Sequence, residues 1–265
     1  MEPLRHYLLA LQYFTRIPVT GPLAQWADYS PERLRASAAH FPGVGVLVGF
    51  CAAGVAAGLL HVLKPTALAS LVAAVVSTLA TVLLTGALHE DGLADVADGL
   101  GGSPDRERAL EIMKDSRVGA FGVLALVLAL LSKVSLLALI GDADTSALGV
   151  ALVLAHVVSR TWPLLLIRWL PHVGDTALSK SKPLADRISR ASLAAGFTWL
   201  LLVLTLAAWA RGPVFLFLPM VASLIALLAL KRLFRRRLGG FTGDCLGATQ
   251  QVCEIAFYLG LALGL

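Results

Sequence analysis

Hydrophobic residues along this chain come in long blocks separated by short polar segments. The longest and purest blocks cover residues 43–63, 67–88, 119–140 and 147–170, and shorter or less pure ones cover 193–210, 214–230 and 246–265. A helix of about 20 apolar residues crosses the hydrocarbon core of a bilayer. The pattern therefore predicts an all-α, polytopic membrane protein with about seven transmembrane helices in a single membrane domain over residues 1–265.

Residues 1–42 precede the first block and carry a different pattern. Leu4, Leu8 and Leu11 recur at helical spacing, and turn-forming residues follow them at Pro18 and Gly21. We expect this segment to be an amphipathic lead-in that lies at the cytoplasmic interface.

Composition supports the membrane interpretation. The chain is 57% hydrophobic and 15% charged, with a mean hydropathy of +0.79, which excludes an ordinary soluble domain. The three cysteines, Cys51, Cys245 and Cys253, show no spacing typical of a disulfide framework or of a metal site.

The positions of the basic residues predict the orientation of the helices. Most of the 22 lysines and arginines lie in the segments 5–35, 106–117, 168–190 and 231–237, which fall on one side if the helices alternate. Segments rich in lysine and arginine stay in the cytoplasm. We therefore expect a multi-pass protein of the bacterial inner membrane with a cytoplasmic N-terminus, and cytoplasmic connections at 89–118, 171–192 and 231–245.

An acidic motif follows the second hydrophobic block. Asp91, Asp95 and Asp98 are spaced i, i+4 and i+7, which places them on one face of a helix, and Glu90 adds a fourth carboxylate. Like charges stacked in this way repel one another unless a cation lies among them. Carboxylate oxygens are ligands that Mg²⁺ prefers, so we expect these residues to hold Mg²⁺ with a phosphorylated substrate.

The segment after the acidic motif contains groups that suit phosphate. Glycines such as Gly101 and Gly102 permit a close approach of the backbone and offer N–H donors. Lys114 and Arg117, with the hydroxyl of Ser116 between them, can neutralise and bind phosphate oxygens. Alternatively, the segment is a solvated helix with ordinary basic flanks.

A second polar turn and several charges within the hydrophobic blocks complete the candidate site. Asp244 lies in a glycine-rich turn on the same predicted side as the acidic motif, although it could also be the N-cap of the last helix. Arg160 lies in the middle of a block, where charge is costly, and we expect it to face the interior and contact an anion. His89 could act as a base or hold Asp91 by a hydrogen bond.

These motifs together resemble a known family. The run from Leu88 to Gly102, the run from Glu111 to Gly122 and the turn from Phe241 to Thr249 resemble signatures of the bacterial cobalamin synthases, the adenosylcobinamide-GDP ribazoletransferases. The segments Phe14–Val19 and Phe41–Gly45 are also similar to that family. The resemblance extends over nearly the whole chain.

The resemblance implies the last assembly step of adenosylcobalamin. A ribose hydroxyl of α-ribazole, or of its 5′-phosphate, attacks the cobinamide-side phosphorus of adenosylcobinamide-GDP, and GMP leaves. Asp91, Asp95 and Asp98 would then hold Mg²⁺, Asp244 would complete the site or orient the nucleophile, and His89 or an aspartate would accept the proton. The expected partners are these small molecules and the lipid bilayer, without nucleic acid.

Two other classes of protein remain open. A membrane CDP-alcohol phosphotransferase also uses clustered aspartates at a membrane boundary, but its usual Asp-Gly-x-x-Ala-Arg start is matched poorly here. A cation transporter would carry carboxylates near the middle of several helices, whereas here they cluster at one boundary. Release of CMP or of GMP, or the absence of both, separates the three classes.

Overall fold

The protein is described by a computed structural model that covers residues 2–66, 68–174 and 188–265. The described residues form helices and connecting turns, with one isolated β-bridge between His172 and Phe241. The helices are α1 (Glu2–Phe14), α2 (Gly21–Ala27), α3 (Pro31–Ser37), η1 (Ala38–His40), α4 (Phe41–Val62), α5 (Ala69–Thr85), α6 (Leu88–Gly102), α7 (Arg106–Ile112), α8 (Ala120–Ala143), α9 (Thr145–Trp169), α11 (Arg190–Arg211), α12 (Val214–Arg237) and α13 (Gly243–Ala262). The predicted all-α membrane fold is confirmed.

Within the described residues, five helical segments are long and apolar enough to cross a membrane. They are Pro31–Val62, which includes α4, and the helices α8, α9, α11 and α12. The bent pair of α5 and α6 makes a sixth if it is counted as one crossing. The expected count of about seven is therefore not confirmed.

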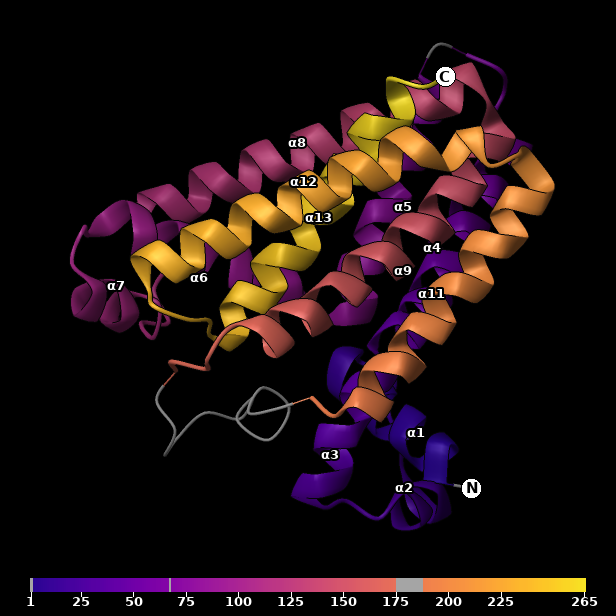
Figure 1. Ribbon diagram of the computed structural model, residues 1–265. Helices are drawn as coiled ribbons and strands as arrows, with labels where there is room; N and C mark the ends of the chain where they lie inside the picture. Colours follow the sequence, from indigo (N-terminus) through magenta and orange to yellow (C-terminus); the bar gives the residue numbers. More distant parts are fainter. Residues whose placement is uncertain (1, 67, 175–187) are drawn as a thin grey trace.

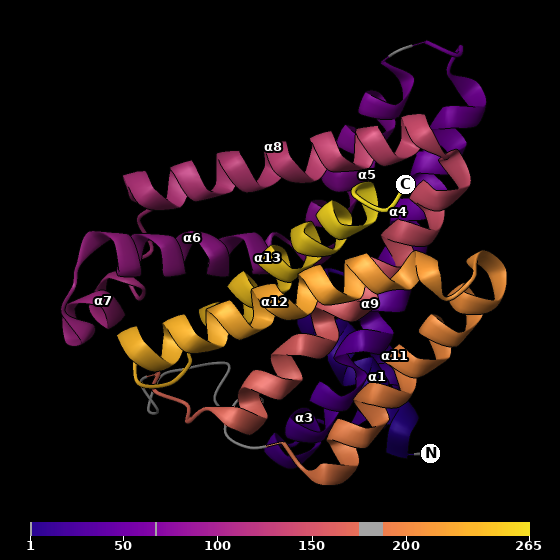
Figure 2. The same cartoon turned by 45° about the horizontal axis from the view of Figure 1, so that its top comes forward.

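Helix α13 is the main reason for the lower count. We predicted a membrane span over residues 246–265, but Gln250, Gln251 and Glu254 make this helix too polar to qualify. Their side chains are all buried, because α13 runs inside the bundle and packs against α6, α8, α9 and α12. Figures 1 and 2 show α13 between α8 and α12.

The bend between α5 and α6 positions the acidic motif. The two helices meet at 89°, and both residues of the break, Gly86 and Ala87, have left-handed backbone angles with φ of 66° and 58°. Glycine adopts this region without strain, whereas alanine pays about 1–2 kcal/mol. The predicted apolar block 67–88 therefore ends in a sharp turn, and α6 begins at its far side.

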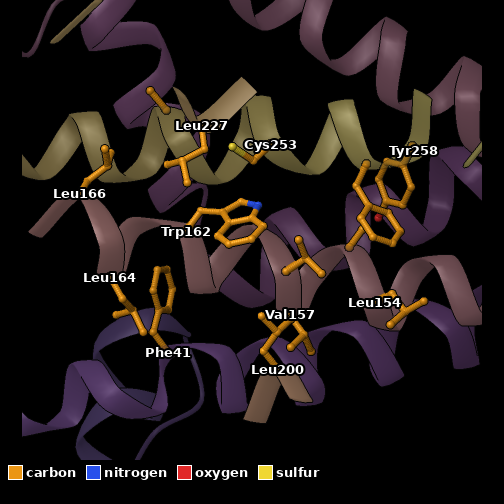
Figure 3. Close-up of a cluster of buried hydrophobic side chains, with 14 of the residues drawn as sticks. Phe41, Leu154, Val157, Trp162, Leu164, Leu166, Leu200, Leu227, Cys253 and Tyr258 are labelled. Carbon is orange, nitrogen blue, oxygen red and sulfur yellow. The ribbon is translucent and has the colours of Figure 1, made fainter. Parts of the chain in front are cut away.

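Large apolar side chains fill the centre of the bundle. Figure 3 shows Trp162 of α9 with Leu227 of α12 and Cys253 of α13 on one side, and Val157 of its own helix and Leu200 of α11 on the other. The indole Nε1 donates to Ser223 Oγ at 2.8 Å, so the buried polar end of the ring is satisfied. This core holds α9 and α13 together beneath the acidic helix.

The predicted lead-in forms α1, α2 and α3, which lie beside one end of α4 and α11 (Figure 1). The ring of Phe14 stacks on Phe41 at 4.0 Å between centroids, and the Arg16 N–H donates to the Leu84 carbonyl at 2.7 Å. The lead-in is thereby fixed to the α5–α6 bend. Of the predicted inner connections, 171–192 lies largely outside the described residues, and 231–245 is helical as far as Arg237.

Candidate active site

The three aspartates of α6 differ in exposure along one face of the helix. Asp91 is exposed, Asp95 is half-buried and Asp98 is buried. Asp95 lies within electrostatic range of both others and of Asp244 at the start of α13. The structure therefore brings together the four aspartates that the sequence singled out.

Asp98 connects the acidic helix to α8. Its Oδ2 accepts a hydrogen bond from the Gly119 N–H and its Oδ1 accepts one from the Gly122 N–H, both at 2.7 Å. A Cβ atom added to Gly122 would lie 2.3 Å from Asp98 Oδ2, so only glycine fits there. The carboxylate satisfies backbone donors at the N-terminus of α8, where the helix dipole favours negative charge. Each oxygen keeps one further lone pair.

Asp244 lies in the first turn of α13 and is not its N-cap. Thr242 is the cap, and its hydroxyl also donates to Asp244 Oδ2 at 3.1 Å. Helix α6 passes close to this turn. A Cβ added to Gly92 would lie only 2.8 Å from the Asp244 carbonyl oxygen. The half-buried carboxylate of Asp244 is thus held at the α6–α13 crossing.

Glu90 and His89 are buried inside the bundle. Gln251 Nε2 donates to Glu90 Oε1 at 3.0 Å, which directs this carboxylate toward α13. The His89 ring stacks on Phe41 with centroids 5.7 Å apart, and its exposed fraction is 2%. Both side chains therefore contact other residues of the bundle and do not face the exposed Asp91.

A cavity of about 320 Å³ lies at the junction of α6, α7 and α8. It is lined by Asp98 and Phe121, and by Arg108 and Arg117, which are ion-paired with two acidic residues of the same lining, Glu111 and Asp115. Arg117 forms a two-pronged ion pair with Asp115, which holds the pKa of that carboxyl at about 2, below its ordinary value. Both guanidinium groups are exposed and accessible to an anion.

The remaining predicted phosphate contacts lie around this cavity or apart from it. Lys114 and Ser116 are exposed in the α7–α8 connection. Gly101 and Gly102 belong to the last turn of α6 and are still helical. A Cβ on Gly101 would lie 2.6 Å from the Phe121 ring, so this glycine permits close packing of α8.

Arg160 is buried in the bundle, with an exposed fraction of 2%. Its NH1 lies 2.9 Å from His156 Nδ1, and its guanidinium carbon lies 5.8 Å from the centre of the Phe41 ring. The expected interior position is found. Its surroundings are protein side chains, however, and the cavity that contains Arg117 does not include it.

The sequence interpretation missed two arginines at the site. Arg108 lines the cavity, but on the sequence it is one of many charges in a polar helix. Arg16 lies at the α5–α6 bend, where a Cβ on Gly86 would be 2.0 Å from Arg16 Nε. The segment Phe14–Val19 signalled Arg16 as part of a motif, but contact with residue 86 depends on the tertiary fold.

The chemistry of the acidic residues fits a divalent cation. Within the described part of the chain, Asp91, Asp95, Asp98 and Asp244 form no ion pair with a lysine, arginine or histidine. No three acidic, histidine or cysteine side chains of that part are close enough together to form a complete metal cage. Mg²⁺ commonly uses one or two carboxylates and takes its other ligands from substrate phosphates and water, so the arrangement suits a substrate-completed site.

Comparison with known proteins gives a consistent result over the whole chain. The family model described as cobalamin-5-phosphate synthase matches residues 6–262. A protein of Polaromonas sp. strain JS666 is 64% identical over 98% of this chain and 97% of its own, and one of Albidiferax ferrireducens is 60% identical over 99% of each. A protein of Vibrio cholerae is 42% identical over 96% of this chain and 91% of its own. All three are named adenosylcobinamide-GDP ribazoletransferase, and no solved structure matches the chain.

Proposed function

Since the chain belongs to the cobalamin-5-phosphate synthase family, we propose that the acidic face of α6 is the active site of its transferase reaction. The chain is an adenosylcobinamide-GDP ribazoletransferase, as are its relatives at 60–64% identity. The observation that carries the proposal is the set of four aspartates on α6 and α13 that have no cationic partner in the described chain. Mg²⁺ bound together with the pyrophosphate substrate would supply the missing positive charge.

Asp91 and Asp95 are the best candidates to hold Mg²⁺. They follow one another on the same helix face, and neither carboxylate accepts a hydrogen bond from another described residue. Asp98 and Glu90 already accept hydrogen bonds from the protein, so we give them supporting roles. Bound Mg²⁺ would neutralise charge on the leaving phosphate during displacement at the pyrophosphate.

Asp244 is suited to receive the proton of the nucleophile. In the proposed step, a ribose oxygen of α-ribazole or its 5′-phosphate forms a bond to the cobinamide-side phosphorus. The bond from that phosphorus to the oxygen of GMP breaks, and the hydroxyl proton passes to the Asp244 carboxylate. Thr242 orients this carboxylate by bonding Oδ2, and Oδ1 stays available for the hydroxyl.

Arginines near both ends of α6 can bind the phosphates. Arg108 and Arg117 line the same cavity as Asp98, and Arg16 lies beside the bend where α6 begins. A helix of 15 residues is about 22 Å long, whereas the two phosphorus atoms of a pyrophosphate share one oxygen, so the two ends of α6 suit phosphates of different substrates: the pyrophosphate of adenosylcobinamide-GDP at one end and the 5′-phosphate of α-ribazole 5′-phosphate at the other. Guanidinium groups bind phosphate oxygens with two parallel hydrogen bonds.

We place this face on the cytoplasmic side of the bacterial inner membrane. The N-terminal helices, α7 and the basic end of α12 lie toward one end of the bundle, and the short turns after α8 and α11 lie toward the other (Figure 1). Segments rich in lysine and arginine remain in the cytoplasm. The end that carries the basic residues is therefore the cytoplasmic one, and this supports a cytoplasmic active site.

An activity assay with the purified protein tests the proposal. The purified protein in detergent is given adenosylcobinamide-GDP and α-ribazole, with and without Mg²⁺. We expect GMP and adenosylcobalamin in equal amounts, only when Mg²⁺ is present. No turnover by folded protein would contradict the proposal, and release of CMP from a CDP-alcohol would favour the lipid enzyme.

A further inference from the structure

The cytoplasmic end of α12 carries two kinds of basic residue. Arg237 points inward, and its NH2 donates to the carbonyls of Leu100 and Ser103 at the end of α6. Lys231, Arg232, Arg235 and Arg236 instead line a groove of about 620 Å³ together with Leu228. None of these lining residues belongs to the cavity at the junction of α6, α7 and α8.

The charge in this groove has no counterpart in the described chain. The spacing i, i+1, i+4 and i+5 places the four cations on one side of the helix. No described aspartate or glutamate forms an ion pair with any of them. Four neighbouring positive charges repel one another, so an external anion would stabilise them.

The neighbouring residues indicate the level in the bilayer at which the groove lies. Lys231 Nζ lies 4.3 Å from the centre of the Trp169 ring at the end of α9, and this indole is 41% exposed. Ile225 and Leu228, one to two turns earlier on α12, are also exposed. Tryptophan and lysine are typical of the headgroup level of a bilayer, and exposed apolar residues beside them contact acyl chains.

We propose that the groove at the C-terminal end of α12, beside Trp169 of α9, binds the headgroup of an anionic phospholipid. The phosphate lies among the arginines, the Trp169 ring borders the glycerol region, and the acyl chains follow Leu228 and Ile225 into the bilayer. A lipid fits better than the nucleotide substrate because exposed apolar residues continue the groove along the same helix. Juxtamembrane clusters of four or more basic residues attract anionic lipids in this way.

Binding of lipid to the full-length protein in detergent tests the proposal independently of catalysis. Native mass spectrometry compares the retention of phosphatidylglycerol with that of phosphatidylcholine. We expect Arg232→Gln/Arg236→Gln to weaken phosphatidylglycerol binding by about thirtyfold, since each basic residue contributes ~1 kcal/mol at such a surface. Arg232→Lys/Arg236→Lys keeps the charge and should lose much less.

A matched control removes two charges elsewhere. Arg5 and Arg33 are each paired with carboxylates, so Arg5→Gln/Arg33→Gln should leave phosphatidylglycerol binding within about twofold. Equal retention of both lipids, or unchanged retention by the glutamine variant, would overturn the proposal. Displacement of the lipid by GDP would assign the groove to the substrate instead. Thermal unfolding of each variant shows whether a loss reflects misfolding.

Discussion

Lys133 of α8 and Glu254 of α13 form an ion pair inside the bundle, with Nζ 2.7 Å from Oε1 and exposed fractions of 2% and 0%. The same carboxylate also accepts a hydrogen bond from the Tyr258 hydroxyl at 3.1 Å. The lysine therefore does not extend to the membrane surface. This pair fixes α13, and with it Asp244, against α8.

Loss of this lysine should destabilise the protein strongly. In Lys133→Met, a buried carboxylate keeps its charge without its main cationic partner, and breaking such a pair costs about 3–5 kcal/mol. Thermal or denaturant unfolding in detergent measures the change. Lys133→Met/Glu254→Gln should be less destabilised than the single variant. If the single variant is as stable as the parent, the pair does not hold α13 in place.

Asp98 is expected to matter for stability as well as for activity. In Asp98→Asn, one of the two backbone N–H groups of Gly119 and Gly122 faces an amide donor, which costs about 1.5–3 kcal/mol. The start of α8 would then loosen and the adjacent cavity would change shape. Unfolding measurements and GMP release should fall together. Normal stability in this variant would contradict the role of Asp98 as an anchor.

His89 should be replaceable by another ring. Since it is buried and stacks on Phe41, His89→Phe should keep GMP release within about threefold of the parent. Removal of a general base would lower the rate by about 10²–10⁴. Steady-state kinetics of folded protein separate the two results. A loss in the larger range would return the role of base to His89.

The arginines of the site should act on substrate binding. Arg117→Gln and Arg108→Gln each remove a charge-assisted phosphate contact, which contributes ~1.5–3 kcal/mol, so we expect KM for adenosylcobinamide-GDP to rise roughly tenfold or more. Arg16→Gln, at the other end of α6, should instead raise KM for α-ribazole 5′-phosphate by a similar factor. Arg190→Gln, at the exposed start of α11, is the control and should change nothing. An unchanged KM in all three site variants would remove the arginines from the phosphate site.

Local pattern was sufficient to predict the acidic helix and its three aligned aspartates. The periodicity of residues 88–102 depends only on neighbours in the chain, and α6 forms as expected. Hydropathy also predicted the membrane fold, because the outer helices face lipid and are therefore rich in apolar residues.

Features that depend on distant contacts could not be predicted in this way. The partners of Asp98 are 21 and 24 residues away, and those of Lys133 and Arg16 are further still. The bend at Gly86 and Ala87 lies at the end of a block that is hydrophobic enough on average to predict a membrane span, so hydropathy alone gives no sign of it. The apolar residues of 246–265 led us to predict a membrane span there, yet the polar residues of α13 are partners for α6, α8 and α9.

The most direct test of the proposed site compares two aspartate variants. Asp91 is exposed on α6, and Asp142 is exposed at the opposite end of α8. Asp91→Asn should lower Mg²⁺-dependent GMP release by more than ~100-fold with unchanged unfolding temperature, because a metal ligand contributes several kcal/mol to charge stabilisation. Asp142→Asn should retain full activity. An active Asp91→Asn enzyme would contradict the assignment of the acidic face as the metal-dependent active site.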